Sequence, residues 1–263
     1  MYVGNTTEMR LPRHDTSLSL PAEQPREALA RDEALLEQLD GGSSAEPLVR
    51  WWVAASPAVV VGLGLSHRLG SVVDLDRCRG AGVAVLQRKA GGGALLLDAH
   101  MLCGAICLPT SAVSADLTAS YRWLGERLAS ALRTTGVPDA RRVEVLEARA
   151  DVAELRNRDD PIARLLLSTC YGALSPHEVI INHQKGKLVG LAQVRRRHAA
   201  LFQFGILLRD QSPLAGYLRV PDEAARAQLS IELRARTVGL ESLTPRSASE
   251  VAAAVAGATP CAQ

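Results

Sequence analysis

The segment of residues 85–98, VLQRKAGGGALLLD, constrains the fold more than any other stretch of this chain. Two apolar runs of strand length flank a basic pair and a glycine triplet, which together comprise Arg88, Lys89, Gly91, Gly92 and Gly93. Glycine has no Cβ, so a strand–turn–strand unit with this centre lets another backbone or a ligand approach closely. The pattern predicts two buried strands joined by a bare, cationic turn.

Phosphate-binding loops of the common kinds do not fit this turn. A mononucleotide loop needs Lys and Ser or Thr directly after its last glycine, at the start of a helix. Residues 94–97 read as a strand, which also excludes a dinucleotide-binding turn. Two interpretations remain open: a plain turn that uses positive φ, or a ligand-contacting backbone whose amides meet an oxygen, with Arg88 and Lys89 adding charge.

Hydrophobic periodicity predicts a mixture of strands and helices in one α+β domain, a mixed β-sheet flanked by helices. Residues 136–168 are charged and read as an irregular surface region, and the turn HQKG joins a hairpin within residues 178–192. We expect an N-terminal arm over 1–22, the main domain over 23–258 and a tail over 259–263. The strand candidates are 48–54, 58–61, 83–86, 94–97, 105–108, 178–182, 187–192 and 200–208, and the helix candidates are 26–39, 74–80, 115–135, 222–233 and 247–256.

Charge and composition narrow the class of protein. The net charge is +2, from 30 basic and 28 acidic residues, which gives no reason to expect a nucleic acid or a membrane as partner. The five cysteines lack paired spacing, and Cys103 and Cys107 lie in an apolar run, so we expect buried thiols and no metal site. Without a signal-peptide pattern or a run of membrane-span length, we expect a cytoplasmic protein.

A lysine begins the apolar segment GKLVGLAQVRRRH, residues 186–198. Strand alternation places Lys187 on one face with Val189 and Leu191. Its ammonium either reaches solvent past these groups or acts as a fixed cation that polarises a carbonyl or clamps a phosphate. Gly190 is again a place for close backbone approach. The run Arg195–Arg197 is either a patch that faces acidic carrier proteins or a solvated hairpin end.

Cys170 differs from the other cysteines because its segment, STCYGALSPHE, reads as a loop. A reactive cysteine needs a neighbouring cation or a helix N-terminus, and the sequence leaves open whether Cys170 has one. His177 is either a base for this thiol or an ordinary surface residue.

Taken in order, these segments resemble the lipoate–protein ligase and octanoyltransferase superfamily, which includes biotin–protein ligases. The resemblance spans residues 26–256 and is carried by several motifs together: DEALLEQ, PLVRWWV, PAVVVGLG, QRKAGGGALLLD, CYGALSPHEVIINHQKGKLVGLAQVRR and RTVGLESL. It implies a biotin/lipoate protein ligase-like catalytic domain over 23–258. The glycine turn would form one wall of an acyl or acyl-adenylate pocket, and Lys187 would contact the activated acyl carbonyl. The implied substrate-binding residues are Arg88, Lys89, Gly91, Gly92, Gly93, Gly190, Ala192 and Gln193.

The resemblance implies two alternative reactions. Cys170 lies eight residues before Glu178, at the nucleophile position of a cysteine-dependent octanoyltransferase. Such an enzyme needs no cofactor and takes octanoate from acyl carrier protein through a thioester. The three-glycine form of the loop is instead typical of ligases, which activate lipoate or octanoate with ATP and Mg²⁺ through lipoyl-AMP. We expect no accessory domain after residue 256, which favours transfer.

Either enzyme would modify a lysine of a lipoyl domain, in a 2-oxoacid dehydrogenase or in the glycine cleavage H protein. The chain departs from the family pattern at Leu97 and Phe204, where histidines are usual, and at Leu191, where serine is usual. These departures leave a third interpretation open, a non-catalytic protein that binds acyl chains or lipoyl domains.

Overall fold

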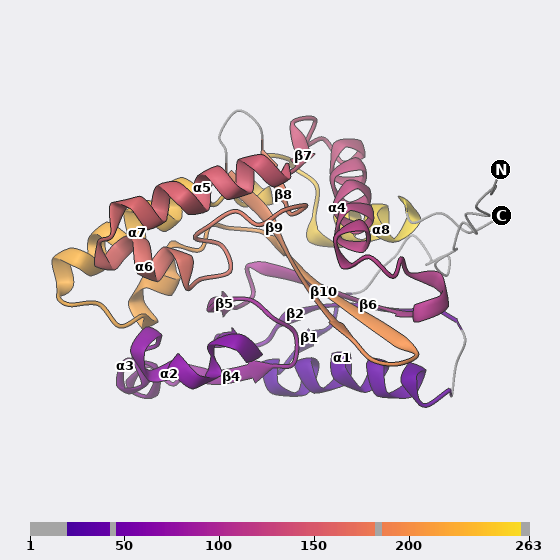
Figure 1. Cartoon of the computed structure of the whole chain (residues 1–263), viewed down its shortest axis with the longest axis horizontal. Helices are drawn as coiled ribbons and strands as arrows, with labels where there is room; N and C mark the ends of the chain where they lie inside the picture. The colour runs from indigo at the N-terminus through magenta and orange to yellow at the C-terminus, as the bar shows by residue number, and fades with distance from the viewer. Residues whose placement is uncertain (1–19, 43–45, 182–185, 259–263) are drawn as a thin grey trace.

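The computed structural model describes residues 20–42, 46–181 and 186–258. The expected tail, most of the expected arm and most of the HQKG turn lie outside these residues. Two sheets form the centre of the molecule, with helices around them (Figure 1). The strands are β1 (Ala22–Glu23), β2 (Leu48–Ala54), β3 (Ala58–Gly62), β4 (Ala84–Arg88), β5 (Leu95–Leu97), β6 (Met101–Pro109), β7 (Ala140–Arg142), β8 (Val179–Ile181), β9 (Gly186–Arg195) and β10 (Ala199–Leu207).

Eight α-helices and four 3₁₀ turns connect the strands within the described residues. The helices are α1 (Pro25–Asp40), α2 (Leu69–Val72), α3 (Leu75–Gly80), α4 (Leu117–Thr134), α5 (Val145–Arg158), α6 (Pro161–Leu167), α7 (Glu223–Arg236) and α8 (Ala248–Ala258). The 3₁₀ turns are η1 (Leu63–Arg68), η2 (Thr110–Ala112), η3 (Ser212–Tyr217) and η4 (Leu240–Ser242). The α+β class and the mixed sheet flanked by helices are confirmed.

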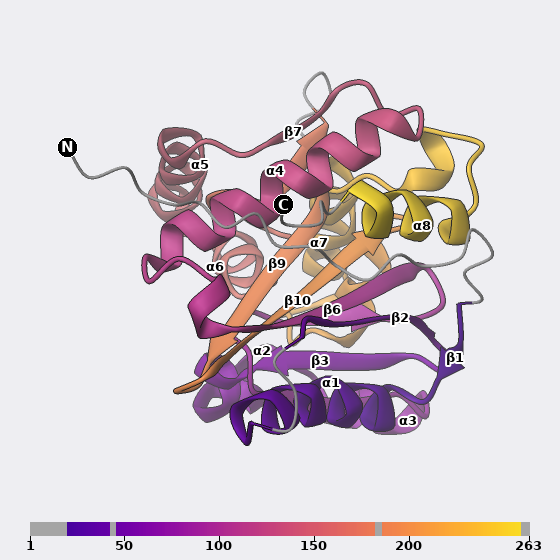
Figure 2. The ribbon, with the colours of Figure 1, turned by 90° about the vertical axis from the view of Figure 1, so that its right-hand side faces the viewer.

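The larger sheet has seven strands in the order β1-β2-β6-β10-β9-β8-β7. All its pairings are antiparallel except that of β1 with β2. Alternate residues of β6 and β10 point to opposite faces. Helix α1 covers one face, where Leu36 packs against Cys107 and Leu201, while α4 and α8 lie side by side over the other (Figure 2).

The smaller sheet has three strands in the order β4-β3-β5 and carries the glycine turn. β4 pairs with β3 in parallel, and β5 pairs with β3 antiparallel. The chain therefore leaves β4 at Arg88, passes through the three glycines, and re-enters the same sheet on the other side of β3. The predicted strand–turn–strand unit is confirmed, although its two strands are separated by a third.

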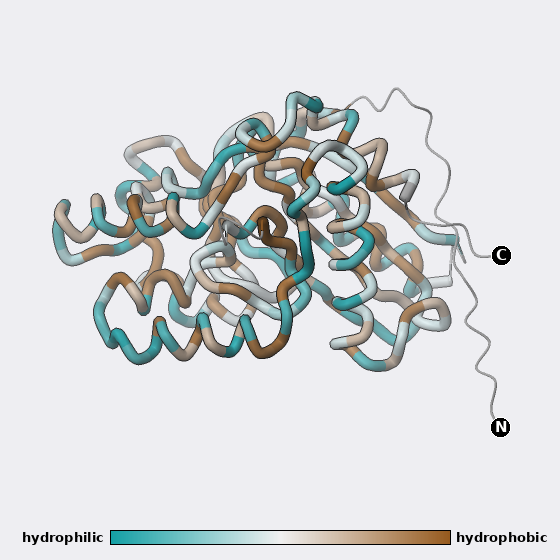
Figure 3. Tube along the Cα trace, turned by 90° about the horizontal axis from the view of Figure 1, so that it is seen from above, coloured by the Kyte–Doolittle hydropathy of each residue, from teal (hydrophilic) through white to brown (hydrophobic). Residues whose placement is uncertain are grey.

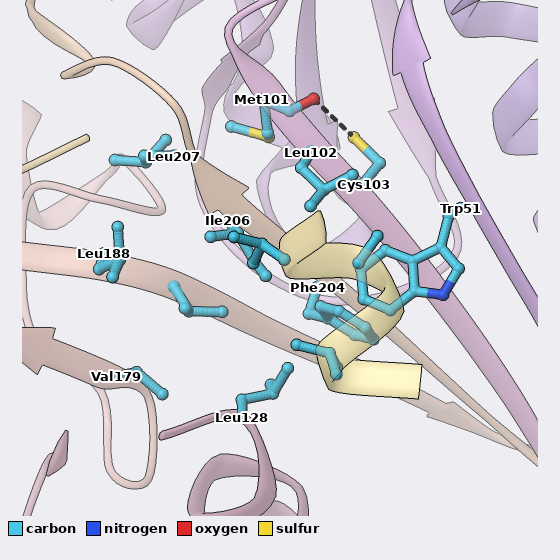
Figure 4. Close-up of a cluster of buried hydrophobic side chains, with 14 of the residues drawn as sticks. Trp51, Met101, Leu102, Cys103, Leu128, Val179, Leu188, Phe204, Ile206 and Leu207 are labelled. Atoms are coloured by element: carbon cyan, nitrogen blue, oxygen red, sulfur yellow. Dashed lines mark hydrogen bonds between the residues drawn. The ribbon is translucent and has the colours of Figure 1, made fainter. Parts of the chain in front are cut away.

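Buried side chains of the two sheets form two main cores. One lies between the larger sheet, α4, α8 and one face of the smaller sheet, and includes Leu102, Phe204 and Ile206 (Figure 4). The other lies between the opposite face of the smaller sheet and α6 and α7, and includes Val59 and Leu166. Along the outer helices, short hydrophobic and hydrophilic segments alternate within the turns, as expected for helices with one buried face (Figure 3).

The interpretation of residues 136–168 as an irregular surface region is wrong. This segment forms β7, α5 and α6. Helix α5 buries only Ala148 and Leu155, so its apolar period is weak in the sequence. A capping box of Glu144 and Glu147 sets its start, and it ends at Asp159, whose backbone is in the left-handed conformation. Local end signals, rather than hydrophobic periodicity, define this helix.

Within the described residues, no helix combines the length and the apolar character that crossing a membrane requires.

Candidate active site

The glycine turn is shaped by contacts with two other backbones. A Cβ at Gly93 would lie 2.3 Å from the carbonyl oxygen of Ser168, so only glycine fits there. Gly92 has a φ of +114°, and a Cβ on it would lie 2.8 Å from Cys170 Sγ. Gly91 meets no such contact. The turn therefore needs glycine both for its conformation and for close approach to the Cys170 segment.

Cys170 is held against this turn immediately after α6. Its backbone N–H donates to the Ala94 carbonyl at 2.8 Å, and its Sγ lies 3.1 Å from the Gly93 carbonyl oxygen. Arg88 Nη2 lies 3.6 Å from the same sulfur and donates to the Gly91 carbonyl at 2.8 Å. The thiol is free and half-buried. Cys170 therefore has the cation contact that a reactive cysteine requires.

A cavity of about 550 Å³ opens beside this thiol. Its volume is within the range of pockets that hold small ligands. It lies between the larger sheet and the smaller one, and Cys170, Gly92 and Gly93 line it. Most of its wall is apolar, formed by Leu29, Trp52, Val60, Leu95, Leu97, Met101, Cys103 and Phe204. Met101, Cys103 and Phe204 are labelled in Figure 4. A half-buried thiol on the wall of an apolar cavity is an arrangement suited to holding and transferring an acyl chain.

Lys187 lies behind Cys170, and its side chain is fully buried. Its ammonium is 2.5 Å from the Glu178 carboxylate, donates to the Ala173 carbonyl at 3.3 Å, and donates to the Cys170 carbonyl. These three acceptors match the three protons of an ammonium group. Burial raises the pKa of Glu178, and the neighbouring Lys187 opposes this shift. The alternative in which Lys187 extends to solvent is therefore wrong.

Only some of the remaining predicted residues reach the cavity. Gly190 lines it, and a Cβ there would lie 3.1 Å from the Tyr171 hydroxyl. Lys89 instead pairs with Glu33 and Glu37 at 3.2 and 3.0 Å, and hydrogen bonds with these two carboxylates raise its pKa. Three further residues implied by the resemblance, Gly91, Ala192 and Gln193, are not among the lining residues.

His177 is neither a surface residue nor a neighbour of the cavity. It is buried beneath α4, where its carbonyl oxygen would lie 1.9 Å from a Cβ on Gly125. Its Nδ1 lies 2.8 Å from Arg142 Nη1. Burial and then the charge of Arg142 lower its pKa. The position of His177 provides no contact through which it could act as a base for Cys170.

A buried polar network at the cavity was missed by the sequence reasoning. Asp32 lines the cavity, is 2% exposed, and accepts hydrogen bonds from Arg50 and from Gln203, the latter at 2.9 Å. Burial raises the pKa of Asp32 to about 6, against the opposing charge of Arg50. One sequence feature could have revealed this buried aspartate: Asp32 stands between Leu29 and Leu36 on the apolar face of the predicted helix.

The three positions that depart from the family pattern, Leu97, Leu191 and Phe204, all line the cavity. Phe204 packs edge-on against Trp51, with ring centroids 5.2 Å apart. Apolar side chains there extend the apolar wall that an acyl chain would contact.

The buried thiols expected at Cys103 and Cys107 are confirmed. Across the described ranges, no three His, Cys, Asp or Glu residues gather where they could hold a metal ion.

Comparisons with known proteins identify the family of this chain. A family model for the lipoyl protein ligase A/B catalytic domain matches residues 24–258. The octanoyltransferase LipM of Moorella thermoacetica is 28% identical over 235 residues, which are 88% of this chain and 78% of the relative. Lipoate-protein ligase A subunit 1 of Thermoplasma acidophilum is 25% identical over 227 residues, 86% of this chain and 75% of the relative.

Solved structures show the same fold. A bi-partite lipoate protein ligase from Thermoplasma acidophilum, whose structural study includes its E2 lipoyl domain, superposes with a TM-score of 0.68 at 22% identity. The match covers 91% of this chain and 82% of the other. The fold is that of biotin/lipoate ligase catalytic domains. The protein belongs to the lipoyl protein ligase A/B catalytic domain family.

Proposed function

We propose that this enzyme transfers an octanoyl or lipoyl group to the target lysine of a lipoyl domain through a thioester on Cys170. Its relatives are octanoyltransferases and a lipoate-protein ligase, so acyl transfer in protein lipoylation is the activity of its class. The observation that carries the cysteine mechanism is the free, half-buried thiol of Cys170 on the wall of the apolar cavity, beside Arg88.

The proposed reaction has two steps. The Cys170 thiol gives up its proton and its sulfur attacks the acyl carbonyl of a thioester donor. A new carbon–sulfur bond forms to Cys170, the donor's own carbon–sulfur bond breaks, and the donor leaves as a thiol that carries the proton. The neutral amine of the acceptor lysine then attacks the Cys170 thioester, a carbon–nitrogen bond forms and the Cys170 carbon–sulfur bond breaks. The proton that the amine loses restores the Cys170 thiol. A thiolate is both a good nucleophile and a good leaving group, so one residue serves both steps. No cofactor enters this sequence.

The cavity would hold the chain during both steps. Its apolar wall removes the methylene groups from water, at about 0.8 kcal/mol for each one buried. The glycine turn, through Gly92 and Gly93, would bring backbone against the acyl carbon attached to sulfur. Arg88 is the contacting cation that would stabilise negative charge on the thiol before attack.

The role of Lys187 as stabiliser of the acyl carbonyl is part of this proposal. Its ammonium already donates to Glu178, Ala173 and Cys170, so it would have to exchange one of these acceptors for the acyl oxygen. The carbonyl of Cys170 is the acceptor nearest in sequence to the reacting sulfur. Exchange there would place a buried cation where negative charge develops.

The proposed acceptor is a lipoyl domain, because the structural study of the archaeal ligase describes that ligase and its E2 lipoyl domain as one lipoylation system. The glycine cleavage H protein as a second acceptor, acyl carrier protein as the donor and a cytoplasmic location remain predictions from the sequence.

An ATP-dependent lipoate–protein ligase is the second candidate function. It is favoured by the similarity to the archaeal ligase subunit and by the three-glycine turn. In this reaction lipoyl-AMP would form with ATP and Mg²⁺, and Cys170 would be incidental. The third interpretation, a non-catalytic binding protein, is not supported by the named relatives.

Substitution of the thiol separates the two reactions. Purified Cys170→Ala protein is compared with wild type in acyl transfer to a lipoyl domain, with octanoyl-acyl carrier protein or with octanoate plus MgATP as donor. Loss of transfer from the carrier with Cys170→Ala supports the proposal. ATP-dependent activity that survives the substitution contradicts it. Cys78→Ala removes a buried thiol that does not line the cavity and serves as the control.

A further inference from the structure

A second hollow, of about 400 Å³, adjoins the cavity beside Cys170, which is called the acyl cavity below. It lies between α2 and α6, which face each other in Figure 1, and residues 219–221 complete its wall. Three of its lining residues are arginines, Arg68, Arg164 and Arg219. Its lining, drawn entirely from the described residues, contains no Asp or Glu. The hollow is therefore positively charged.

The charges of these arginines are largely available to a ligand. Arg68 and Arg219 are exposed and have no carboxylate partner within the described residues. Arg164 pairs with Asp159 at 2.8 Å, but the Asp159 side chain is 85% exposed, so solvent weakens this pairing. By contrast, Arg195 of the Arg195–Arg197 run already donates to Ser120 at 2.9 Å.

The hollow is continuous with the proposed active site. Arg68, Arg164 and Ser168 line both the hollow and the acyl cavity. Ser168 stands two residues before Cys170, so their Cα atoms lie within about 7 Å of each other. A molecule whose acyl carbon is at Cys170 could therefore place an anionic group further along the same molecule among the arginines.

We propose that this hollow binds the phosphate ester of the acyl donor while its acyl chain fills the apolar cavity. This inference rests on the proposed function and assigns the donor's anionic group to Arg68, Arg164 and Arg219. Guanidinium groups donate paired hydrogen bonds to phosphate oxygens. The hydroxyls of Ser71 and Ser168 already donate to the carbonyls of Arg68 and Arg164, at 2.7 and 2.9 Å, so the arginines are the donors for the phosphate. The hollow thereby distinguishes a phosphorylated thioester arm from the same arm without phosphate.

The test measures binding without chemistry, on the Cys170→Ser variant. Isothermal titration calorimetry compares 4′-phosphopantetheine with pantetheine, which is the same thiol arm without the phosphate. We expect at least a tenfold tighter binding of the phosphorylated arm, about the effect of one charge-assisted hydrogen bond. In Cys170→Ser, the added pair Arg68→Gln and Arg219→Gln should remove this difference, while Arg149→Gln, an exposed arginine outside both hollows, should keep it.

Three outcomes would overturn the inference: equal binding of the two arms, a preference that survives the double arginine substitution, or tighter binding of adenosine 5′-monophosphate than of 4′-phosphopantetheine. The last result would assign the arginines to a nucleotide. Thermal unfolding of each variant verifies that it is folded. Because no acyl group is transferred in this experiment, its result is independent of whether Cys170 forms a thioester.

Discussion

At the scale of single residues, Cys170 contacts backbone and a guanidinium rather than a side-chain base. Its sulfur lies against Gly93 and Arg88, and no histidine lines the cavity within the described residues. The reactivity of this thiol therefore depends on how the glycine turn is placed. Within that turn, Gly92 has a positive φ, and the Cys170 sulfur lies close to the position that a Cβ of residue 92 would occupy.

Replacement of Gly92 by alanine should disable the site. The new Cβ would lie 2.8 Å from both Cys170 Sγ and Arg88 Nη2, in a backbone conformation that costs an L-residue about 1–2 kcal/mol. We expect a loss of stability of that size in chemical denaturation, and a larger loss in the rate of Cys170 acylation.

Gly91→Ala is the matched control, because a Cβ at Gly91 meets nothing within 4 Å. We expect its stability to remain within about 0.5 kcal/mol of wild type. Equal loss of acylation in the two variants would mean that the turn tolerates no side chain at all and that Gly92 has no special contact with the thiol.

Asp32 gives the protein a predictable pH dependence. Its pKa is about 6 in the folded protein and near 3.8 in the unfolded chain, so the folded state binds the extra proton between these values. The stability of wild type should therefore fall, relative to Asp32→Asn, as pH rises from about 4 to 6, by about 2–3 kcal/mol.

Urea unfolding of both proteins at several pH values measures this difference. Comparison with Asp32→Asn cancels the titration of all other groups. A difference that is constant across this range, or that changes in the opposite direction, would show that folding does not raise the pKa of Asp32 above its value in the unfolded chain.

At the scale of elements, Lys187 ties strand β9 to the loop that carries Cys170. A charge pair buried this deeply is costly to break, because the remaining partner is left in an apolar environment. We expect Lys187→Met to destabilise the protein by about 3–5 kcal/mol. Adding Glu178→Gln removes the unpaired charge but keeps an acceptor for the Ser175 amide, so most of the stability should return.

Transfer activity of this double variant separates packing from chemistry. If Lys187 stabilises the acyl oxygen, activity should stay about 100-fold below wild type even though stability returns. Recovery of activity together with stability would instead assign Lys187 a purely structural role. The Glu178→Gln variant alone is the control for the altered acceptor.

The elements themselves were largely predictable where one face is strongly apolar. The predicted strand 48–54 coincides with β2, and Ser247 and Glu250 cap α8 through the expected hydrogen bonds, at 2.8 and 3.2 Å. Helix α5 could not be found by periodicity, because it buries few apolar residues. The predicted strand 105–108 was too short because β6 is apolar on both faces from Met101 onward.

At the scale of the whole molecule, the cavity arises from pairings that no local pattern reveals. Ala94 bridges to Thr169 across 75 positions of the chain, and this bridge brings Cys170 to the glycine turn. The sequence identified Cys170, the turn and Lys187 as candidates. It did not show that Lys187 is enclosed behind the thiol, or that Lys89 pairs with α1 instead of facing the cavity.

The catalytic domain over 23–258, with an arm and a tail beyond it, remains a prediction, although the family model matches nearly the same range.

Arginines are distributed unevenly over the molecule. Arg68, Arg88, Arg156 and Arg164 all line the acyl cavity, whereas the net charge of the chain is only +2. Because the only acidic residues that line this cavity, within the described residues, are Asp32 and Glu178, basic residues outnumber acidic ones where an anionic donor would approach.

Intact-mass spectrometry under denaturing conditions tests the proposed thioester most directly. The protein is incubated with octanoyl-acyl carrier protein without a lipoyl domain, so that the second step cannot remove the intermediate. We predict a mass increase of one octanoyl group, lost on treatment with hydroxylamine and absent from Cys170→Ser. Folded wild-type protein that gains no mass, while it still modifies a lipoyl domain with octanoate and MgATP, would contradict the account and establish the ligase reaction.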